Sequence, residues 1–168
     1  LGMSPPLTDA LAAEVAGGKG VGPAGLSAAN LLRLSTQVPR RIQIAVPARA
    51  GRSTPTVEFE SRAARTGRRS AGLDRTEVAI LEVLNDLSTS ELSPQESWRQ
   101  LRGAVLSGRV RPERLARAAK TEPAVTRARL SELLRDAGMA GLAAAGGSTG
   151  ARPRSRLAQV SPESVRVW

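Results

Sequence analysis

The 168-residue chain contains no cysteine, histidine or tyrosine. Without cysteine it has no disulfide framework, no zinc–thiolate site and no thiol nucleophile. Without histidine it has no Ser-His-Asp triad and no imidazole metal ligand. Any catalysis would depend on serine, threonine, carboxylate, lysine or arginine side chains. Only Phe59, Trp98 and Trp168 are aromatic, so platforms for stacking the bases of single-stranded nucleic acids are nearly absent.

The chain also lacks a long apolar run. The longest uncharged apolar stretch, residues 139–145, is far too short to span a bilayer. No basic segment followed by an apolar core marks a secretory signal at the start. A chain of this length forms one domain or two small ones and buries about 70% of its unfolded surface. We therefore expect a cytoplasmic protein with no membrane association and a largely aliphatic core.

Positive charge is concentrated in the middle of the chain. Residues 38–72 carry eight arginines against two glutamates, whereas residues 73–137 carry eleven basic and ten acidic residues. Such a cluster attracts phosphate backbones or an acidic protein surface, although a solvated, solubilising surface is the simpler alternative. The residues expected to contact a partner or a nucleic acid are these eight: Arg40, Arg41, Arg49, Arg52, Arg62, Arg65, Arg68 and Arg69.

The first 72 residues predict a small α/β region. Capping and glycine signals predict helices over 7–16 and 27–34. Strict alternation of apolar and polar residues predicts strands over 41–46 and 56–60. We expect these strands to pair as an antiparallel hairpin whose apolar face is covered by the helices. Residues 61–72 are basic and contain glycine, which is typical of a mobile connector.

From Asp74 onward the apolar residues follow helical spacing. Asp74 and Glu77 resemble a capping box, although the usual first residue is serine or threonine. Further helices are predicted to open at three prolines, since proline is favoured at the first helical position: Pro94, Pro112 and Pro123. The short connections between them are typical of helical bundles.

Together these elements predict an α+β fold, with a small antiparallel sheet covered by helices and a helical C-terminal half. We divide the chain into three parts. Residues 1–72 form the small α/β region with the basic hairpin and connector, and residues 73–138 form the helical region. Residues 139–168 have the composition of a linker and a basic tail.

Three further patterns suggest chemistry, and each has a simpler structural explanation. The glycine-rich loop 17–22 lacks the Walker spacing and follows a predicted helix rather than a strand. The acidic residues of segment 74–86 are better explained as solvated helix faces than as metal ligands. The predicted helix pair spanning 111–137 resembles a helix-turn-helix, but the region is too acidic for a phosphate footprint. We therefore expect no catalytic residue, no metal site and no cofactor.

Residues 25–39 read Gly-Leu-Ser-Ala-Ala-Asn-Leu-Leu-Arg-Leu-Ser-Thr-Gln-Val-Pro, and Ile-Gln-Ile-Ala-Val follows at 42–46. This stretch resembles the core motif of AbiEi-type antitoxins, which belong to type IV-like toxin–antitoxin systems. In that family a helix of small residues leads through such a motif into a strand. The similarity covers about residues 7–66. It implies an antitoxin that neutralises a cognate AbiEii-type nucleotidyltransferase toxin.

The resemblance also implies two alternative functions. Such antitoxins commonly carry an N-terminal winged helix that binds the promoter of their own operon, and none precedes Leu7 in this sequence. Neutralisation is therefore favoured over transcriptional autoregulation through promoter DNA. A third interpretation makes the antitoxin an atypical serine/threonine protein kinase that phosphorylates the toxin, although no kinase loop is visible. The arginines would complement the toxin's carboxylates, compete for its nucleic-acid substrate, or bind promoter DNA.

Overall fold

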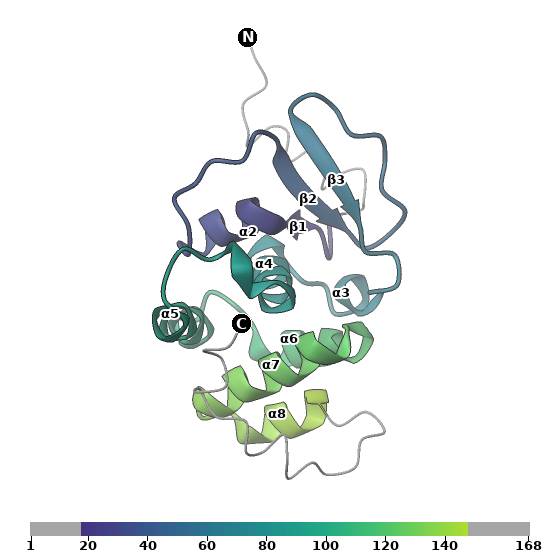
Figure 1. Cartoon of the computed structure of the whole chain (residues 1–168). Helices are drawn as coiled ribbons and strands as arrows, with labels where there is room; N and C mark the ends of the chain where they lie inside the picture. The colour runs from purple at the N-terminus through teal and green to yellow at the C-terminus, as the bar shows by residue number, and fades with distance from the viewer. Residues whose placement is uncertain (1–17, 148–168) are drawn as a thin grey trace.

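The computed structural model describes residues 18–147, and the side chains of residues 18–144 (Figure 1). The helix predicted over 7–16 and the predicted tail 148–168 lie outside these residues. Within them the chain has the expected α+β fold, with a small sheet at one end and helices forming the rest. In chain order the elements are β1 (Gly22–Pro23), α2 (Gly25–Leu31), β2 (Ile42–Val46), β3 (Val57–Ser61), α3 (Gly67–Ser70), α4 (Arg75–Asn85), η1 (Leu87–Thr89), α5 (Pro94–Leu106), α6 (Pro112–Ala118), η2 (Ala119–Thr121), α7 (Ala124–Asp136) and α8 (Ala140–Gly147).

The sheet has the order β1-β2-β3 and is mixed rather than antiparallel. Strand β1 pairs with β2 in the antiparallel direction, but β2 and β3 run parallel, with Ile44 opposite Phe59. The predicted hairpin between these two strands is therefore wrong. Alternation of apolar and polar residues is the same in both kinds of pairing, so the sequence pattern did not distinguish them.

The segment that joins β2 to β3, residues 47–56, follows the outer edge of β3 instead of turning tightly. The hydroxyl of Ser61 donates a 2.8 Å hydrogen bond to the Ala48 carbonyl, and the backbone N–H of Phe59 donates to Ser53 Oγ at 3.2 Å. Near the start of β3 the backbone N–H of Thr54 donates to the Val57 carbonyl at 2.8 Å. These hydrogen bonds hold residues 47–56 along β3. The segment therefore covers the outer edge of β3, which would otherwise be open to pairing with another strand.

The two faces of the sheet belong to different cores. Ala45 is fully buried in the main core together with α2 and α4. Ile44, Val46 and Val57 face the other way and pack with Val21 in a second, smaller cluster, whose members among residues 18–147 all lie outside the helices. Among residues 18–147 the helices lie on the face that carries Ala45, and the predicted helix over 7–16, which we expected to help cover the strands, lies outside these residues.

Helix α4 is the centre of the fold. Asp74 and Glu77 form the predicted capping box: Asp74 Oδ1 accepts from the backbone N–H of Glu77 at 2.9 Å, and Glu77 Oε1 accepts from that of Asp74 at 2.8 Å. Strand β1 lies directly on this helix, since a Cβ atom on Gly22 would come within 2.7 Å of Val78 Cβ. Helix α4 is therefore buried along most of its length.

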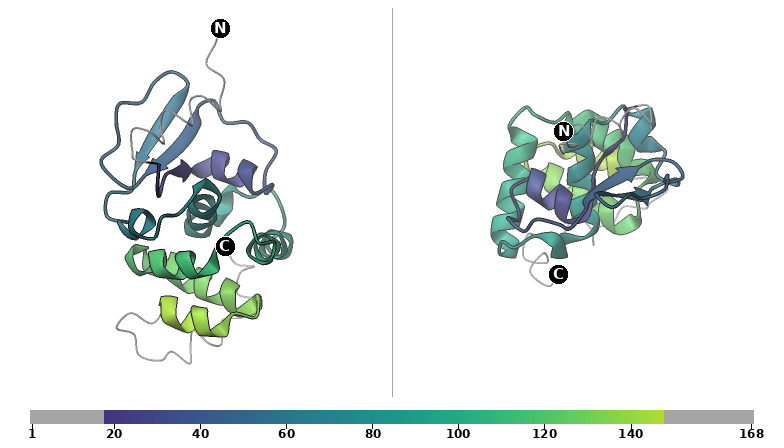
Figure 2. Two further views of the ribbon diagram at one scale, coloured as in Figure 1. Left: turned by 180° about the vertical axis from the view of Figure 1, so that it is seen from behind. Right: turned by 90° about the horizontal axis from the view of Figure 1, so that it is seen from above.

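The remaining helices stack away from the sheet, with α7 and α8 at the far end (Figure 2). Helices α5 and α6 begin at the predicted prolines, and α7 begins one residue after Pro123. The indole Nε1 of Trp98 donates a 2.7 Å hydrogen bond to Asp136 Oδ2 and so links α5 to the end of α7. No helix within residues 18–147 has the length and hydropathy needed to cross a bilayer.

Residues 140–147, which we predicted to be linker, form helix α8. This part of the chain packs against α7: Ala143 is 1% exposed, and Ser131 Oγ donates a 3.0 Å hydrogen bond to its carbonyl. Gly138, with φ of +83°, ends α7 and turns the chain back. The composition of this stretch does not distinguish a flexible linker from a helix of small residues that fits closely against its neighbour.

Candidate partner-binding surface

The structure divides the eight arginines of the predicted field into an inner and an outer group. Arg68 is fully buried, and Arg62 and Arg65 have side chains that are 20% and 18% exposed. The other five lie at the surface, with Arg41 partly exposed and the rest exposed: Arg40, Arg41, Arg49, Arg52 and Arg69. A stretch that looks uniformly basic in sequence therefore contains two kinds of arginine, those that are largely buried within the fold and those that lie at the surface.

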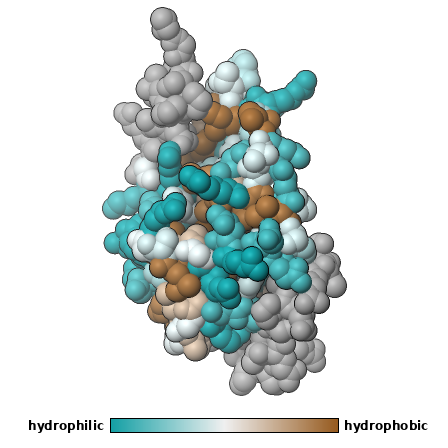
Figure 3. Space-filling model, turned by 90° about the vertical axis from the view of Figure 1, so that its left-hand side faces the viewer, coloured by the Kyte–Doolittle hydropathy of each residue, from teal (hydrophilic) through white to brown (hydrophobic). Residues whose placement is uncertain are grey.

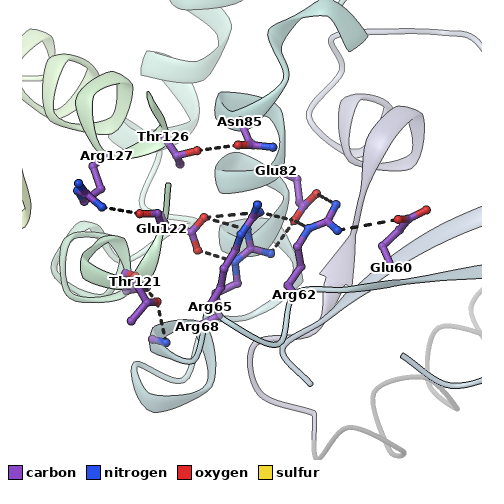
Figure 4. Close-up of polar contacts among 12 residues, drawn as sticks. Glu60, Arg62, Arg65, Arg68, Glu82, Asn85, Thr121, Glu122, Thr126 and Arg127 are labelled. Carbon is purple, nitrogen blue, oxygen red and sulfur yellow. Dashed lines mark hydrogen bonds and ion pairs between the residues drawn. The ribbon is translucent and has the colours of Figure 1, made fainter. Parts of the chain in front are cut away.

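Arg68 is held by two buried carboxylates from separate parts of the chain (Figure 4). Its Nε and Nη2 atoms donate to Glu122 at 2.7 and 3.0 Å, and its Nη1 atom donates to Glu82 Oε2 at 2.7 Å. Burial acts to lower the pKa of Arg68, but the hydrogen bonds and charge of Glu122 outweigh it and raise that pKa above its usual value. Arg68 is therefore a structural cation with no surface for a partner.

Arg62 and Arg65 complete this network. Arg62 forms a two-pronged pair with Glu82, with both N–O distances at 2.9 Å. Arg65 Nη1 lies 3.8 Å from Glu82 and 3.9 Å from Glu122, too far for a hydrogen bond, and has no hydrogen-bond partner in the described structure. Burial lowers the pKa of Arg65, and the charge of Arg68 lowers it further. The carboxylate of Glu82 keeps a pKa below its usual value because hydrogen bonds from Arg62 and the charge of Arg68 outweigh its burial.

The network corrects our expectation for residues 61–72. This stretch was predicted to be a mobile connector, but it contains helix α3 and is fixed at both sides. The backbone N–H of Gly67 donates a 2.9 Å hydrogen bond to Thr121 Oγ1, and a Cβ atom on Gly67 would meet the Ala118 carbonyl at 2.8 Å. The three inner arginines thus join β3 and α3 to α4 and to the start of α7, which leaves the outer arginines as the candidates for contact with a partner.

The segment between α2 and β2 is fixed by Glu91, which lies more than fifty residues further along the chain. Glu91 Oε2 accepts from the backbone N–H groups of Thr36 and Gln37 at 2.6 and 3.0 Å, and also from the hydroxyl of Ser35. The hydrogen bond from Ser35, followed by those from the two backbone N–H groups, lowers the pKa of Glu91. The next residue, Val38, is 87% exposed. We call these hydrogen bonds from segment 35–37 to Glu91 the Glu91 clamp. The residue that follows the clamped segment therefore exposes an apolar side chain to solvent.

The same motif is tied together internally. Asn30 Nδ2 donates to the Leu26 carbonyl at 3.0 Å and to the Gln37 carbonyl at 2.5 Å. Gln43 Oε1 accepts from the backbone N–H of Leu26 at 2.9 Å, at the start of α2. Residues that sequence analysis grouped by resemblance are thus one hydrogen-bonded unit.

Two segments meet beside this unit and form what we call the outer surface: residues 36–41 and the loop 47–56. Arg41 Nη1 donates to the Thr54 carbonyl at 3.4 Å, and the backbone N–H of Ile42 donates to the Thr56 carbonyl at 2.9 Å. Within residues 18–144 no carboxylate forms a salt bridge with any arginine of this surface: Arg40, Arg41, Arg49 and Arg52. The outer surface therefore combines unpaired positive charge with one exposed apolar side chain.

The other motifs have structural roles in the described residues. Gly20, with φ of +78°, donates its N–H to the Leu73 carbonyl and lies against the backbone of α3. Arg127 and Arg129, which would enter a groove in a helix-turn-helix, instead donate to the carbonyls of Glu122 and Leu84 at 2.6 and 2.7 Å. In the part of the chain that the structure covers, no group of three or more carboxylates is arranged to hold a metal ion.

We did not predict from the sequence that Glu91, Glu82 and Glu122 bind the motif and the arginines. Each lies far along the chain from the groups that it binds, and no local spacing connects them. Val38 belongs to the motif that we quoted, but nothing in the sequence indicated that it is exposed.

No family model matches the chain, and no curated protein matches it either. A solved structure with a similar arrangement is the crystal structure of the RV2827C protein from Mycobacterium tuberculosis, with a TM-score of 0.49 and 21% sequence identity. The similarity covers 90% of this chain and 61% of that one, so the present chain spans about three fifths of that protein.

Proposed function

We propose that this chain is a cytoplasmic antitoxin that neutralises a nucleotidyltransferase toxin by binding it through the outer surface. The observation that supports this proposal most strongly is the clamp of Glu91 on segment 35–37. The stretch that resembles the antitoxin motif is the one that the clamp fixes. It presents Val38 beside arginines that have no carboxylate partner within the described residues.

The chemistry of the expected partner fits this surface. A nucleotidyltransferase needs carboxylates to hold its metal ions. The arginines of the outer surface would complement these carboxylates, which would steer the encounter and increase the association rate. Close contact would then bury the side chain of Val38. Burial of this apolar surface would contribute to the binding free energy, and salt does not screen that contribution. Because Arg40, Arg41, Arg49 and Arg52 form no salt bridge within residues 18–144, contact through these four arginines breaks no ion pair among the described residues.

Promoter DNA is the second candidate partner, because the same unpaired arginines also suit phosphate groups. The two candidates differ in their dependence on salt. The logarithm of the affinity for DNA falls steeply and linearly with the logarithm of the salt concentration, and the slope is set by the number of phosphates contacted. Binding to a protein that also buries Val38 should fall less steeply. Phosphorylation of the toxin is an outcome that the experiment below detects, and it would replace the proposal of neutralisation by contact.

The test is co-expression with a nucleotidyltransferase toxin, which the proposal expects to be encoded in a neighbouring reading frame. We define an outer triple variant, R40E/R49E/R52E, and a control triple variant with the same change of charge on α5, α6 and η2, R99E/R117E/K120E. The unaltered chain and the control variant are expected to restore growth, whereas the outer variant does not. Restored growth with the outer variant, or phosphate on the toxin after incubation with ATP and the chain, would contradict the proposal.

A further inference from the structure

A hollow lies between the end of α2 and helix α5, away from the outer surface. Its walls come from three parts of the chain, and six of its lining residues matter here: Leu31, Arg33, Thr76, Gln100, Ser107 and Arg109. Gln100 Nε2 donates to the Leu32 carbonyl at 3.3 Å and holds α5 against the end of α2. The face that carries α5 and the segment after α2 is largely hydrophilic, with small separate hydrophobic patches (Figure 3).

Arg33 occupies a backbone position that favours glycine. Its φ is +62°, the one positive value at a non-glycine residue within 18–147. The hydrogen bonds from Leu34 N–H to the Ala29 carbonyl and from Arg33 N–H to the Asn30 carbonyl form a Schellman motif, with Arg33 at the left-handed position. Glycine would satisfy this turn at a lower conformational cost. The turn itself therefore does not explain why an arginine stands here, whereas a role for its side chain would.

Arg109 is a second arginine that lines the same hollow. It follows Gly108, which has φ of +85° and ends the α5 region, and its backbone N–H donates to Ser107 Oγ at 3.1 Å. No acidic residue lines the hollow. Within residues 18–144, neither the Arg33 nor the Arg109 side chain forms a hydrogen bond or an ion pair. Two arginines thus line one hollow without a carboxylate partner among residues 18–144.

We propose that this hollow binds a small phosphorylated anion, such as inorganic phosphate or a phosphate monoester. The guanidinium groups of Arg33 and Arg109 would each offer a planar fork of N–H donors to the phosphate oxygens. Gln100 and Thr76 add neutral polar groups at the wall, and Leu31 limits the hollow on its apolar side. This site is separate from the outer surface and does not depend on the proposed function.

The experiment titrates the full chain with inorganic phosphate and with pyrophosphate at constant ionic strength, followed by calorimetry and by amide chemical shifts. Saturable binding with one site is expected. Arg33→Gly should weaken it by about tenfold or more, because a charge-assisted hydrogen bond is lost. Arg109→Ala should have a similar effect. The control is Arg99→Ala, which removes an exposed arginine of α5 outside the hollow and should leave binding unchanged.

Arg33→Gly separates binding from folding. Glycine relieves the positive φ, so this variant should unfold at the same or a higher urea concentration than the unaltered chain. A loss of phosphate binding in a variant of equal stability would support the site. The proposal is overturned by the absence of saturable binding, or by phosphate binding that Arg33→Gly and Arg109→Ala leave unchanged. It is also overturned if a short DNA duplex, but not free phosphate, binds in a way that requires both arginines.

Discussion

Glu91 Oε2 accepts a 2.6 Å hydrogen bond from the backbone N–H of Thr36, although 55 positions separate the two residues. Glu91 lies in the segment between η1 and α5, whereas Thr36 lies in the segment before β2. One carboxylate thus fixes the conformation of a surface segment from the helical half of the chain. The outer surface depends on a contact between the two regions that sequence analysis treated as separate.

Replacing Glu91 by alanine should release segment 35–38 while leaving the helical core folded. The Thr36 and Gln37 amides lose their acceptor, so their hydrogen exchange should accelerate markedly while that of α4 stays slow. Glu96→Ala is the matched control, because Glu96 is exposed and pairs only with Arg99 on its own helix. Unchanged protection of Thr36 in Glu91→Ala would show that the clamp does not order this segment.

Replacing Arg68 by methionine should destabilise the fold by about 3–5 kcal/mol, because it leaves two buried carboxylates without their shared partner. The measurement is the free energy of unfolding in urea. Arg40→Met serves as the control and should change that free energy by less than about 0.5 kcal/mol.

A double variant examines the same network more closely. Arg68→Met combined with Glu122→Gln should be less destabilised than the sum of the two single changes, since the second change removes one of the stranded charges. Strict additivity would indicate that Arg68 and Glu122 do not interact in the folded chain.

The stability of the protein should fall in acid through Glu77 and Glu82. Burial acts to raise the pKa of each, but hydrogen bonds from Arg111 to Glu77 and from Arg62 to Glu82 leave both values below the ordinary 4.5. A carboxylate whose pKa is lower in the folded than in the unfolded protein contributes its full stabilisation when the pH lies above its unfolded pKa. This stabilisation is lost as the pH falls through its folded pKa. Urea unfolding should therefore give constant stability from pH 7 to near 4.5 and a decline below it.

The variant Glu82→Gln provides the control for this pH dependence. It should be less stable at pH 7 but should show a shallower decline between pH 4.5 and pH 3, because one of the carboxylates with a lowered pKa is gone. Glu132 acts in the opposite direction, since burial and the charge of Asp136 raise its pKa, and it will reduce the total effect. A decline equally steep in Glu82→Gln would assign the acid sensitivity to other groups.

Gly22→Ala should destabilise the protein by about 1–3 kcal/mol, because its Cβ would come within 2.7 Å of Val78 Cβ and 2.9 Å of the Arg75 carbonyl. Strand β1 would have to move away from α4. Gly51→Ala is the control, since no atom lies within 4 Å of its Cβ position. The midpoint of thermal unfolding measures both effects, and a shift as large for Gly51→Ala would argue against the close approach of β1.

The sequence allowed prediction of features that depend on neighbouring residues. The prolines at 94, 112 and 123 mark the starts of helices through their own backbone geometry, and Asp74 with Glu77 caps α4 within one turn. These elements agree with the structure because their determinants are local. The alternation in 41–46 and 56–60 likewise predicted strands but not the direction in which they pair.

The candidate surface depends on long-range contacts that a single sequence does not reveal. Arg40 and Arg68 look alike in a basic stretch, yet Arg68 is buried because Glu82 and Glu122 reach it from α4 and from the start of α7. The eight arginines could therefore be predicted as a group but not divided into inner and outer members. The same limit applies to Glu91, whose role follows from packing between the segment before β2 and the segment before α5.

The most direct test of the account is the affinity of the purified chain for the nucleotidyltransferase toxin that the proposal expects as its partner, measured at low and at physiological salt. The outer triple variant should bind at least about tenfold more weakly, mainly through a slower association rate, while the control triple variant stays within about twofold. Unaltered affinity of the outer variant, or an equal loss in the control, would contradict binding through the outer surface.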